Sequence, residues 1–225
     1  MMEQKNILWG LLCRRQCLVP TLRGWVLAAL SVAALALVGI CTIGPFLTVS
    51  APVPGGVLVV EGWVPDYVME ATVAEFKQNH YTKLFVTGIP VTQGTLLSEY
   101  KNHAYVGAAT LLKLGLTTND VQAVPTDKIR RDRTYNMALS LKKWLREHDL
   151  SPTRVNLITA GPHGRRSRLM FEKALGKGVR VGVLAIPDRD FDERHWWTSS
   201  QGVRGIIGEA LAYGYARLLF HPPKE

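Results

Sequence analysis

The hydropathy pattern is most uneven near the start of the chain. No charged residue occurs between Arg23 and Glu61, and residues 25–47 (WVLAALSVAALALVGICTIGPFL) are almost wholly apolar. As an α-helix this run would extend about 34 Å, enough to cross a hydrocarbon core of about 30 Å. A buried core helix is the alternative, but such helices are shorter and usually keep a polar edge. The pattern therefore predicts a transmembrane helix at residues 25–47.

The basic residues around this run predict its orientation. Lys5, Arg14, Arg15 and Arg23 precede it, and the first Lys or Arg after it is Lys77. Because basic flanks stay in the cytoplasm, we expect residues 1–24 to form a cytoplasmic arm and the remainder to be extracytoplasmic or periplasmic. The predicted location is the plasma (inner) membrane.

Cleavage of the apolar run as a secretory signal is an open alternative. Residues 49–51 (Val-Ser-Ala) have the small side chains of a peptidase site, but Pro52 directly after them disfavours cutting there. Ile40 before Cys41 argues against a lipoprotein signal, which needs a small residue at that position. An uncleaved signal anchor is the favoured interpretation.

Beyond the apolar run, short runs rich in β-branched residues alternate with helical patterns. Residues 48–56 (TVSAPVPGG) are predicted to be a linker, because their prolines favour extended backbone. Strands are then predicted at residues 57–60, 84–86, 121–124, 155–159 and 179–186, and helices at about 66–80, 95–114, 132–148, 165–175 and 202–220. Apolar strands separated by helices indicate a parallel sheet covered on both faces. Residues 57–225 are thus predicted to form a three-layer, Rossmann-like α/β domain of about five strands.

Composition and charge narrow the function classes. With 47% hydrophobic and 20% charged residues, the chain does not have the composition of a disordered protein. It carries 27 Lys and Arg against 18 Asp and Glu, a formal net charge of +9. A basic balance alone does not indicate nucleic acid, which an extracytoplasmic domain rarely meets, so no nucleic-acid partner is predicted.

The densest basic segment is expected at the carboxyl edge of the sheet, where such folds bind ligands. Residues 160–168 (AGPHGRRSR) place His163, Arg165 and Arg166 at a predicted helix start, where free N–H groups and the helix dipole favour an anion. His163 and Arg166 are the preferred ligand contacts, and Arg165 accompanies them. A basic helix start that only keeps the surface soluble is the open alternative.

A second basic cluster, residues 128–133, precedes another predicted helix. Asp132 is the expected N-cap, and Thr134 falls on the inward stripe of the helix. Arg133 and Thr134 are therefore candidate ligand-binding residues in the same cleft as His163. A solvated charge cluster with a core threonine explains the pattern equally well.

Two acidic residues are candidates for acid/base work with His163. Glu61 ends the first predicted strand, where an unpaired carboxylate is costly unless it faces a cation or a polar cleft. Glu99 has His103 four residues later, which a simple surface pair also explains. The chain contains no motif typical of a bound metal or dinucleotide, so neither a metal site nor a cofactor is predicted.

The order of these short elements resembles the bacterial proteins of the YdcF, SanA and ElyC type, over about residues 57–186. The matching elements are Glu61-Gly62 and Thr87-Gly88 at strand ends, Ser98-Glu99, Arg133-Thr134, and Thr159 to Arg166 (TAGPHGRR). The last is similar to the family's Thr-x-x-x-His-x-x-Arg signature and carries its His and Arg onto His163 and Arg166. The resemblance also adds Thr87 and Gly88 as ligand-binding candidates. Trp63 and Ile89-Pro90 depart from the family's glycine-rich turns.

Three functions follow as expectations. The first is an anchored envelope protein that binds a phosphorylated or anionic ligand, such as a lipid-linked or cell-wall precursor. The resemblance implies a link to envelope barrier function and to cell-wall or lipid-carrier metabolism. The second is a hydrolase or transferase acting on a phosphoester or glycosyl bond, with His163 as acid/base. The third is a scaffold that self-associates through Gly202, Gly205 and Gly208 on the final helix.

Overall fold

The computed structural model describes residues 6–7, 12–13, 20–94, 99–127 and 131–223. The chain divides into two compact units, Met1–Ile40 and Cys41–Glu225. The first unit contains an antiparallel pair of short strands, β1 (Asn6–Ile7) and β2 (Leu12–Cys13), and the first part of helix α1 (Leu22–Leu47). Residues 41–47 of α1 belong to the second unit.

Helix α1 is long and apolar enough to cross a membrane. Its 26 residues correspond to about 39 Å of helix, and none of its most apolar window is buried. The helix begins at Leu22, three residues before the predicted start. No residue between Pro20 and Trp25 prevents a helix, whereas Pro20 itself disfavours extension further back. The predicted apolar helix is confirmed.

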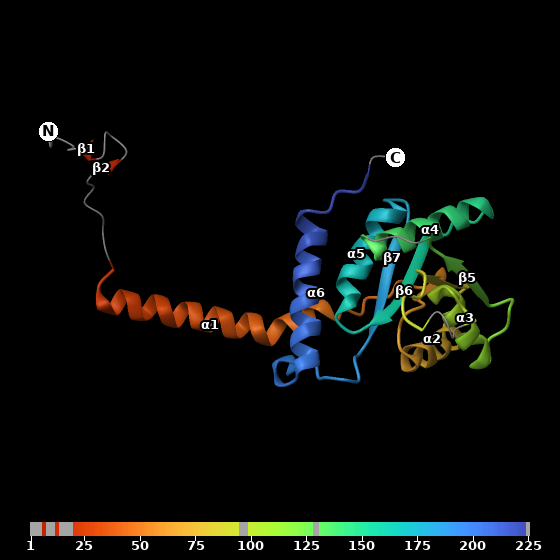
Figure 1. Cartoon of the computed structure of the whole chain (residues 1–225), viewed down its shortest axis with the longest axis horizontal. Helices are drawn as coiled ribbons and strands as arrows, with labels where there is room; N and C mark the ends of the chain where they lie inside the picture. The colour runs from red at the N-terminus through yellow and green to blue at the C-terminus, as the bar shows by residue number, and fades with distance from the viewer. Residues whose placement is uncertain (1–5, 8–11, 14–19, 95–98, 128–130, 224–225) are drawn as a thin grey trace. The chain divides into compact units, whose positions relative to one another are not determined.

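The second unit is built on a five-stranded parallel sheet, as the alternating pattern predicts (Figure 1). The strands lie in the order β5-β4-β3-β6-β7, with β3 in the centre. Their bounds are β3 Val57–Glu61, β4 Leu84–Gly88, β5 Val121–Pro125, β6 Arg154–Ala160 and β7 Arg180–Ile186. The chain adds β4 and β5 on one side of β3 and then crosses to place β6 on the other side. Sheets of this kind bind ligands at such a switch point, outside the carboxyl ends of the strands.

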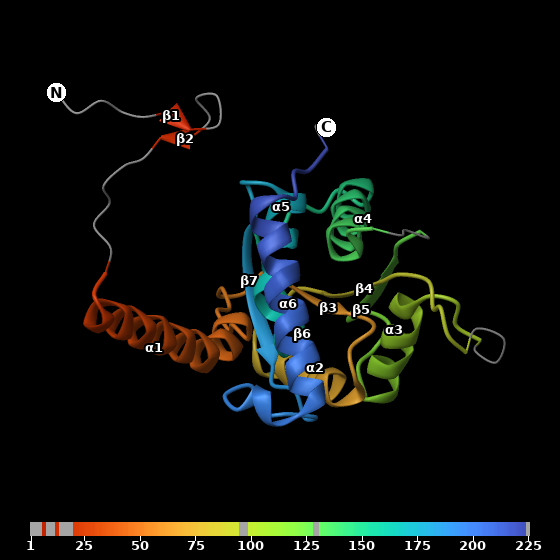
Figure 2. The same ribbon diagram turned by 60° about the vertical axis from the view of Figure 1, so that its left-hand side comes forward.

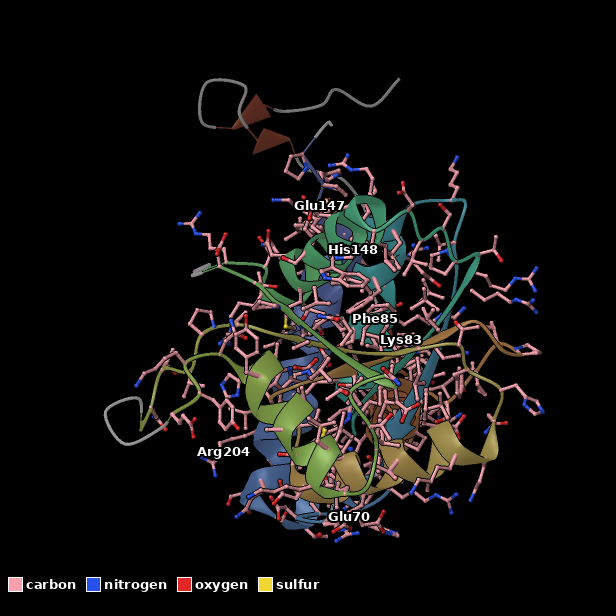
Figure 3. All side chains as sticks on the ribbon, turned by 90° about the vertical axis from the view of Figure 1, so that its right-hand side faces the viewer. Glu70, Lys83, Phe85, Glu147, His148 and Arg204 are labelled. Atoms are coloured by element: carbon pink, nitrogen blue, oxygen red, sulfur yellow. The ribbon has the colours of Figure 1, made fainter. Side chains whose placement is uncertain are left out.

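Helices cover both faces of the sheet, which gives three layers. Helices α2 (Asp66–Gln78) and α3 (His103–Lys113) pack on one face, and α4 (Arg133–Glu147), α5 (His163–Leu175) and α6 (Ser200–Leu218) lie on the other. Alternate residues of β3 point to the two faces of the sheet. Val57 and Val59 pack on the α4–α5 side, and Leu58 and Val60 pack on the α2–α3 side. Glu70 on α2 and Glu147 on α4 mark the two outer surfaces (Figure 3).

Helix α3 begins at His103, whereas the pattern predicts a helix from about residue 95. Residues 95–98 lie outside the described part of the chain, and residues 99–102 are not helical. Asn102 stops the helix from extending backwards, since its side-chain oxygen caps Ala104 N at 2.9 Å and its amide donates to Thr126 O at 3.1 Å. Glu99 and His103 therefore do not share a helix face.

The segment between the apolar helix and β3 is bound to the sheet. Ala51 forms an isolated bridge with Val183 of β7. The buried side chain of Asn156 accepts from Val53 N at 2.8 Å and donates to Val53 O at 2.7 Å. Before this segment, Leu47 is fully buried. The chain leaving the apolar helix is thus held against β6 and β7 by specific hydrogen bonds.

Candidate functional site

A cavity of about 480 Å³ lies at the carboxyl edge of the sheet. It is lined by residues from the loops after β3 and β4 and from helices α3, α4, α5 and α6: Trp63, Ile89, Thr92, His103, Asp132, Arg133, Thr134, Met137, His163, Arg166, Met170, Ala212 and Tyr215. Four of the candidates predicted from the sequence are therefore brought together in one cavity, namely Arg133, Thr134, His163 and Arg166.

Three helix N-termini converge on this cavity. His103, Arg133 and His163 are the first residues of α3, α4 and α5, and all three line it. None of these helices has an acidic residue in its first turn, and α4 and α5 have no side-chain cap. The N–H groups of a helix start have no partner within the helix, and the helix dipole adds positive potential there. This arrangement favours a negatively charged ligand.

The start of α4 presents a cation to the cavity. The Arg133 side chain is exposed and makes no ion pair within the part of the chain that the structure describes. Asp132 occupies the predicted N-cap position, but in a left-handed conformation (φ 50°) in which its side chain does not cap the helix. Instead the Asn136 amide donates to Asp132 O at 3.0 Å and holds this turn. Burial and the nearby charge of Arg133 lower the pKa of His103.

The start of α5 carries a compact ion pair. Arg166 binds Glu209 of α6 with two hydrogen bonds, Nε to Oε2 at 2.7 Å and Nη2 to Oε1 at 3.1 Å. Its Nη1 also donates to Thr134 Oγ1 at 3.3 Å. Burial alone would raise the pKa of Glu209, but the hydrogen bonds from His163 and Arg166 and their charges lower it to about 2. Burial likewise opposes the charge on Arg166, yet Glu209 and then Glu61 raise its pKa. Arg166 is thus largely neutralised by a partner within the fold.

His163 joins this pair through one ring nitrogen. Its Nδ1 lies 2.7 Å from Arg166 Nη2 and 3.0 Å from Glu209 Oε1. An unprotonated Nδ1 accepts from Arg166, whereas a protonated Nδ1 donates to Glu209. The rings of Trp63 and His163 meet edge to face, with centroids 4.7 Å apart. No described residue bonds to Nε2, so a His163 held through Nδ1 can exchange a proton at Nε2 with a bound molecule.

Glu61 does not line the cavity, and its recorded hydrogen-bond partners do not include His163. Its side chain is fully buried at the end of β3. The hydroxyls of Thr159 on β6 and Ser167 on α5 donate to Oε2, the latter at 3.2 Å. Oε1 has no hydrogen-bond partner among the described residues. Glu61 therefore links the two strands at the switch point to α5, and its charge acts on Arg166.

The other predicted candidates that the structure describes are not among the residues that line the cavity. Thr87 and Gly88 are buried at the end of β4, where a Cβ on Gly88 would approach Ala104 N to 2.1 Å, so Gly88 permits α3 to pack closely. The Arg165 guanidinium donates to Phe46 O and lies 3.8 Å from the centroid of the Phe46 ring. Glu99 is exposed in the loop before α3. Lys128 and Arg130 of the second basic cluster fall outside the described residues.

Glu209 belongs to the charged cluster of Arg166 and His163, but the sequence pattern did not predict it. It lies 43 residues beyond Arg166, and no local motif joins the two. One sequence feature could have indicated it: Glu209 is the only acidic residue of α6, a helix otherwise rich in Gly, Ala and apolar residues. A lone carboxylate on a largely apolar helix requires a cation when the helix packs.

No group of three His, Cys, Asp or Glu side chains within the described ranges could hold a metal ion. Comparisons of the chain with protein-family models, with curated proteins and with solved structures gave no match. The interpretation of the cavity therefore depends on its own geometry.

Proposed function

We propose that this is a single-pass, membrane-anchored envelope protein whose extracytoplasmic α/β domain binds a phosphorylated or otherwise anionic ligand. The observation that carries the proposal is the convergence of three helix starts, without acidic first turns, on one cavity. The length and apolarity of α1 support the anchor, and the basic residues before it support the orientation. The resemblance to the YdcF, SanA and ElyC type supports a role in envelope biogenesis or barrier function.

The lining suggests a ligand with two chemical parts. Arg133 offers a guanidinium that no described carboxylate neutralises, which suits a phosphate or carboxylate. Trp63, Met137 and Met170 supply apolar surface beside it. The volume of about 480 Å³ lies within the range of small-molecule sites. A phosphorylated group attached to an apolar or aromatic body, such as a lipid-linked or cell-wall precursor, fits this combination.

Calorimetric titration with inorganic phosphate and pyrophosphate tests the proposal on the full chain in detergent micelles. Wild type is compared with Arg133→Gln, and Arg154→Gln is the matched control, because Arg154 is an exposed arginine at the opposite end of the sheet. We expect Arg133→Gln to weaken binding about tenfold, since a charge-assisted hydrogen bond contributes roughly 1.5 kcal/mol. Equal affinity in all three proteins would contradict the proposed site.

A second candidate function has its own supporting observation, the 3.0 Å contact between His163 Nδ1 and Glu209. A carboxylate that orients one nitrogen of an imidazole prepares the other for proton transfer. The candidate activity is hydrolysis or transfer at a phosphoester or glycosyl bond, with His163 as acid/base. Turnover of generic phosphoesters by the full chain should be lost in His163→Gln. If wild type shows no more turnover than His163→Gln, the enzymatic candidate is contradicted and only the binding function remains.

A further inference from the structure

Helix α6 exposes a continuous apolar stripe. Ile206 and Ala216 on its inner face are buried. Successive residues of a helix are rotated by about 100°, so the outer face is formed by a different set. That set, here called the outer stripe, is Val203, Ile207, Leu211, Tyr215 and Leu218, all exposed, with Leu211 and Leu218 at 72% and 74%. In both ribbon views α6 stands at the outside of the unit (Figures 1 and 2).

This stripe is unusual for a surface helix, which normally places polar residues on its outer face. Isolated exposed leucines are common, but five apolar residues along one helix face form a patch of the kind that marks an interaction surface. Arg204, near the start of the helix, is the one exposed charge on this face among the described residues. Helix α6 is thus apolar on its inner and its outer face, and the rest of the domain covers only the inner face.

We propose that the outer stripe of α6 docks on the surface of the lipid bilayer that α1 spans. Residues 41–47 are the last turns of α1, and they belong to the same compact unit as α6. Leu47 and Ile43 pack with Ile206, and the rings of Phe46 and Tyr213 meet edge to face with centroids 5.7 Å apart. The end of the apolar helix therefore lies against α6. This inference rests on the anchor in the proposed function and is independent of the ligand.

The charges of α6 also suit a lipid surface. Arg204 and Arg217 are exposed near its two ends. Glu209, the only carboxylate of the helix, is occupied by Arg166 and His163. An apolar face with basic residues beside it is the pattern of helices that lie at a membrane interface and bind acidic headgroups. Tyr215 and the exposed Trp197 are residue types enriched at that depth.

A second copy of the chain is a poorer occupant. The stripe is about 22 Å long and one helix wide, which gives a footprint of roughly 200 Å² per copy, far below the roughly 800 Å² per partner of a stable interface. Of the three glycines that could favour close helix contact, Gly202 and Gly205 already contact the fold, and only Gly208 has open space around it. A Cβ on Gly202 would approach Trp196 O to 2.2 Å, and one on Gly205 would lie 3.3 Å from the Phe191 ring.

Docking has a consequence for the cavity. Ala212 and Tyr215 of α6 belong to its lining, and Tyr215 is also part of the outer stripe. One wall of the cavity is therefore made by the helix that lies on the bilayer. A ligand with an apolar tail would reach the cavity without leaving the lipid surface.

Spin labels on the full chain test the docking. Cys13, Cys17 and Cys41 are replaced by Ala, and single labels are placed through Leu211→Cys or Ile207→Cys. Val32→Cys on α1 reports the anchor, and Glu70→Cys, an exposed position on α2, is the control (Figure 3). The proteins are reconstituted in vesicles of phosphatidylcholine and phosphatidylglycerol. Collisions with oxygen, which concentrates in lipid, are compared with those of a water-soluble nickel chelate.

We expect the labels at Leu211 and Ile207 to show a several-fold higher ratio of oxygen to nickel collisions than the label at Glu70. Nickel accessibility equal to that of Glu70, with Val32 in lipid, would overturn the docking and leave the anchor intact. Dipolar coupling between labels at Leu211 would overturn it in favour of a second copy. Nickel access at Val32 would contradict the anchor and the docking together.

Discussion

The helix starts of α4 and α5 carry similar basic residues into one cavity and use them differently. Arg166 of α5 is 17% exposed and bound through two hydrogen bonds to Glu209. Arg133 of α4 is exposed and has no such partner in the described chain. A cation at a helix start is available to a ligand only where the fold supplies no carboxylate. In the proposed site Arg166 therefore stabilises the wall, and Arg133 is the cation that remains available to an anionic ligand.

The largest effect is expected from breaking the pair at α5. Glu209→Gln leaves the largely buried guanidinium of Arg166 without its counterion, which should lower the free energy of unfolding by about 3 kcal/mol. The matched control is Glu172→Gln, which removes the exposed pair between Arg168 and Glu172 on the same helix. That change should cost only about 0.4 kcal/mol. Thermal and denaturant unfolding of the full chain in detergent measures both, and equal losses would contradict the comparison.

The same pair predicts a dependence on pH. The pKa of Glu209 is about 2 in the folded chain, against an ordinary value of 4.5. Because the folded state binds this proton less readily, the stabilisation is complete above about pH 4.5 and is lost as the pH falls towards 2. Wild type should therefore lose more stability than Glu209→Gln across this window, by up to about 3 kcal/mol. Parallel stability profiles for the two proteins would show that Glu209 is not the group responsible.

A smaller effect is expected at Thr134, which connects the two helix starts. Its buried hydroxyl accepts from Arg166 Nη1 at 3.3 Å. Thr134→Val removes this acceptor at constant shape and should cost about 1 kcal/mol of unfolding free energy. Thr134→Ser keeps the hydroxyl and serves as the control. A loss in Thr134→Ser as large as that in Thr134→Val would show that the methyl group, not the hydrogen bond, is what matters.

The smallest effect on stability is expected at α4. Arg133→Gln changes an exposed side chain without an ion pair among the described residues, so the free energy of unfolding should change by less than about 0.5 kcal/mol. Anion affinity should nevertheless fall in this variant. A destabilisation as large as that of Glu209→Gln would mean that Arg133 also has a structural partner.

The sequence predicts the fold well because its strands are continuous apolar runs with helical patterns between them. It misplaces the start of α3, where a tertiary contact between Asn102 and Thr126 decides where the helix begins. It also predicts correctly that His163, Arg166 and Arg133 lie at or near helix starts, since these residues follow strand ends.

What local pattern could not predict is the partner of each charge. The carboxylate that pairs with Arg166 comes from a distant helix, and Arg165 turns towards Phe46 near the end of α1. Both outcomes depend on how separate elements pack. The spacing of residues along one segment contains no information about that packing, so the pairing of Glu209 with Arg166 could be found only in three dimensions.

The most direct test of the anion site uses the histidines of the chain as reporters. Of its six histidines, His103 and His163 line the cavity. The full chain, labelled with ¹⁵N-histidine in detergent micelles, is titrated with phosphate while the ring-nitrogen resonances are recorded at constant pH. Binding at the proposed site should shift the resonances of His103 and His163 with one common affinity and leave those of His80, His148 and His221 unchanged. Unmoved cavity resonances, or equal shifts in all histidines, would contradict the site.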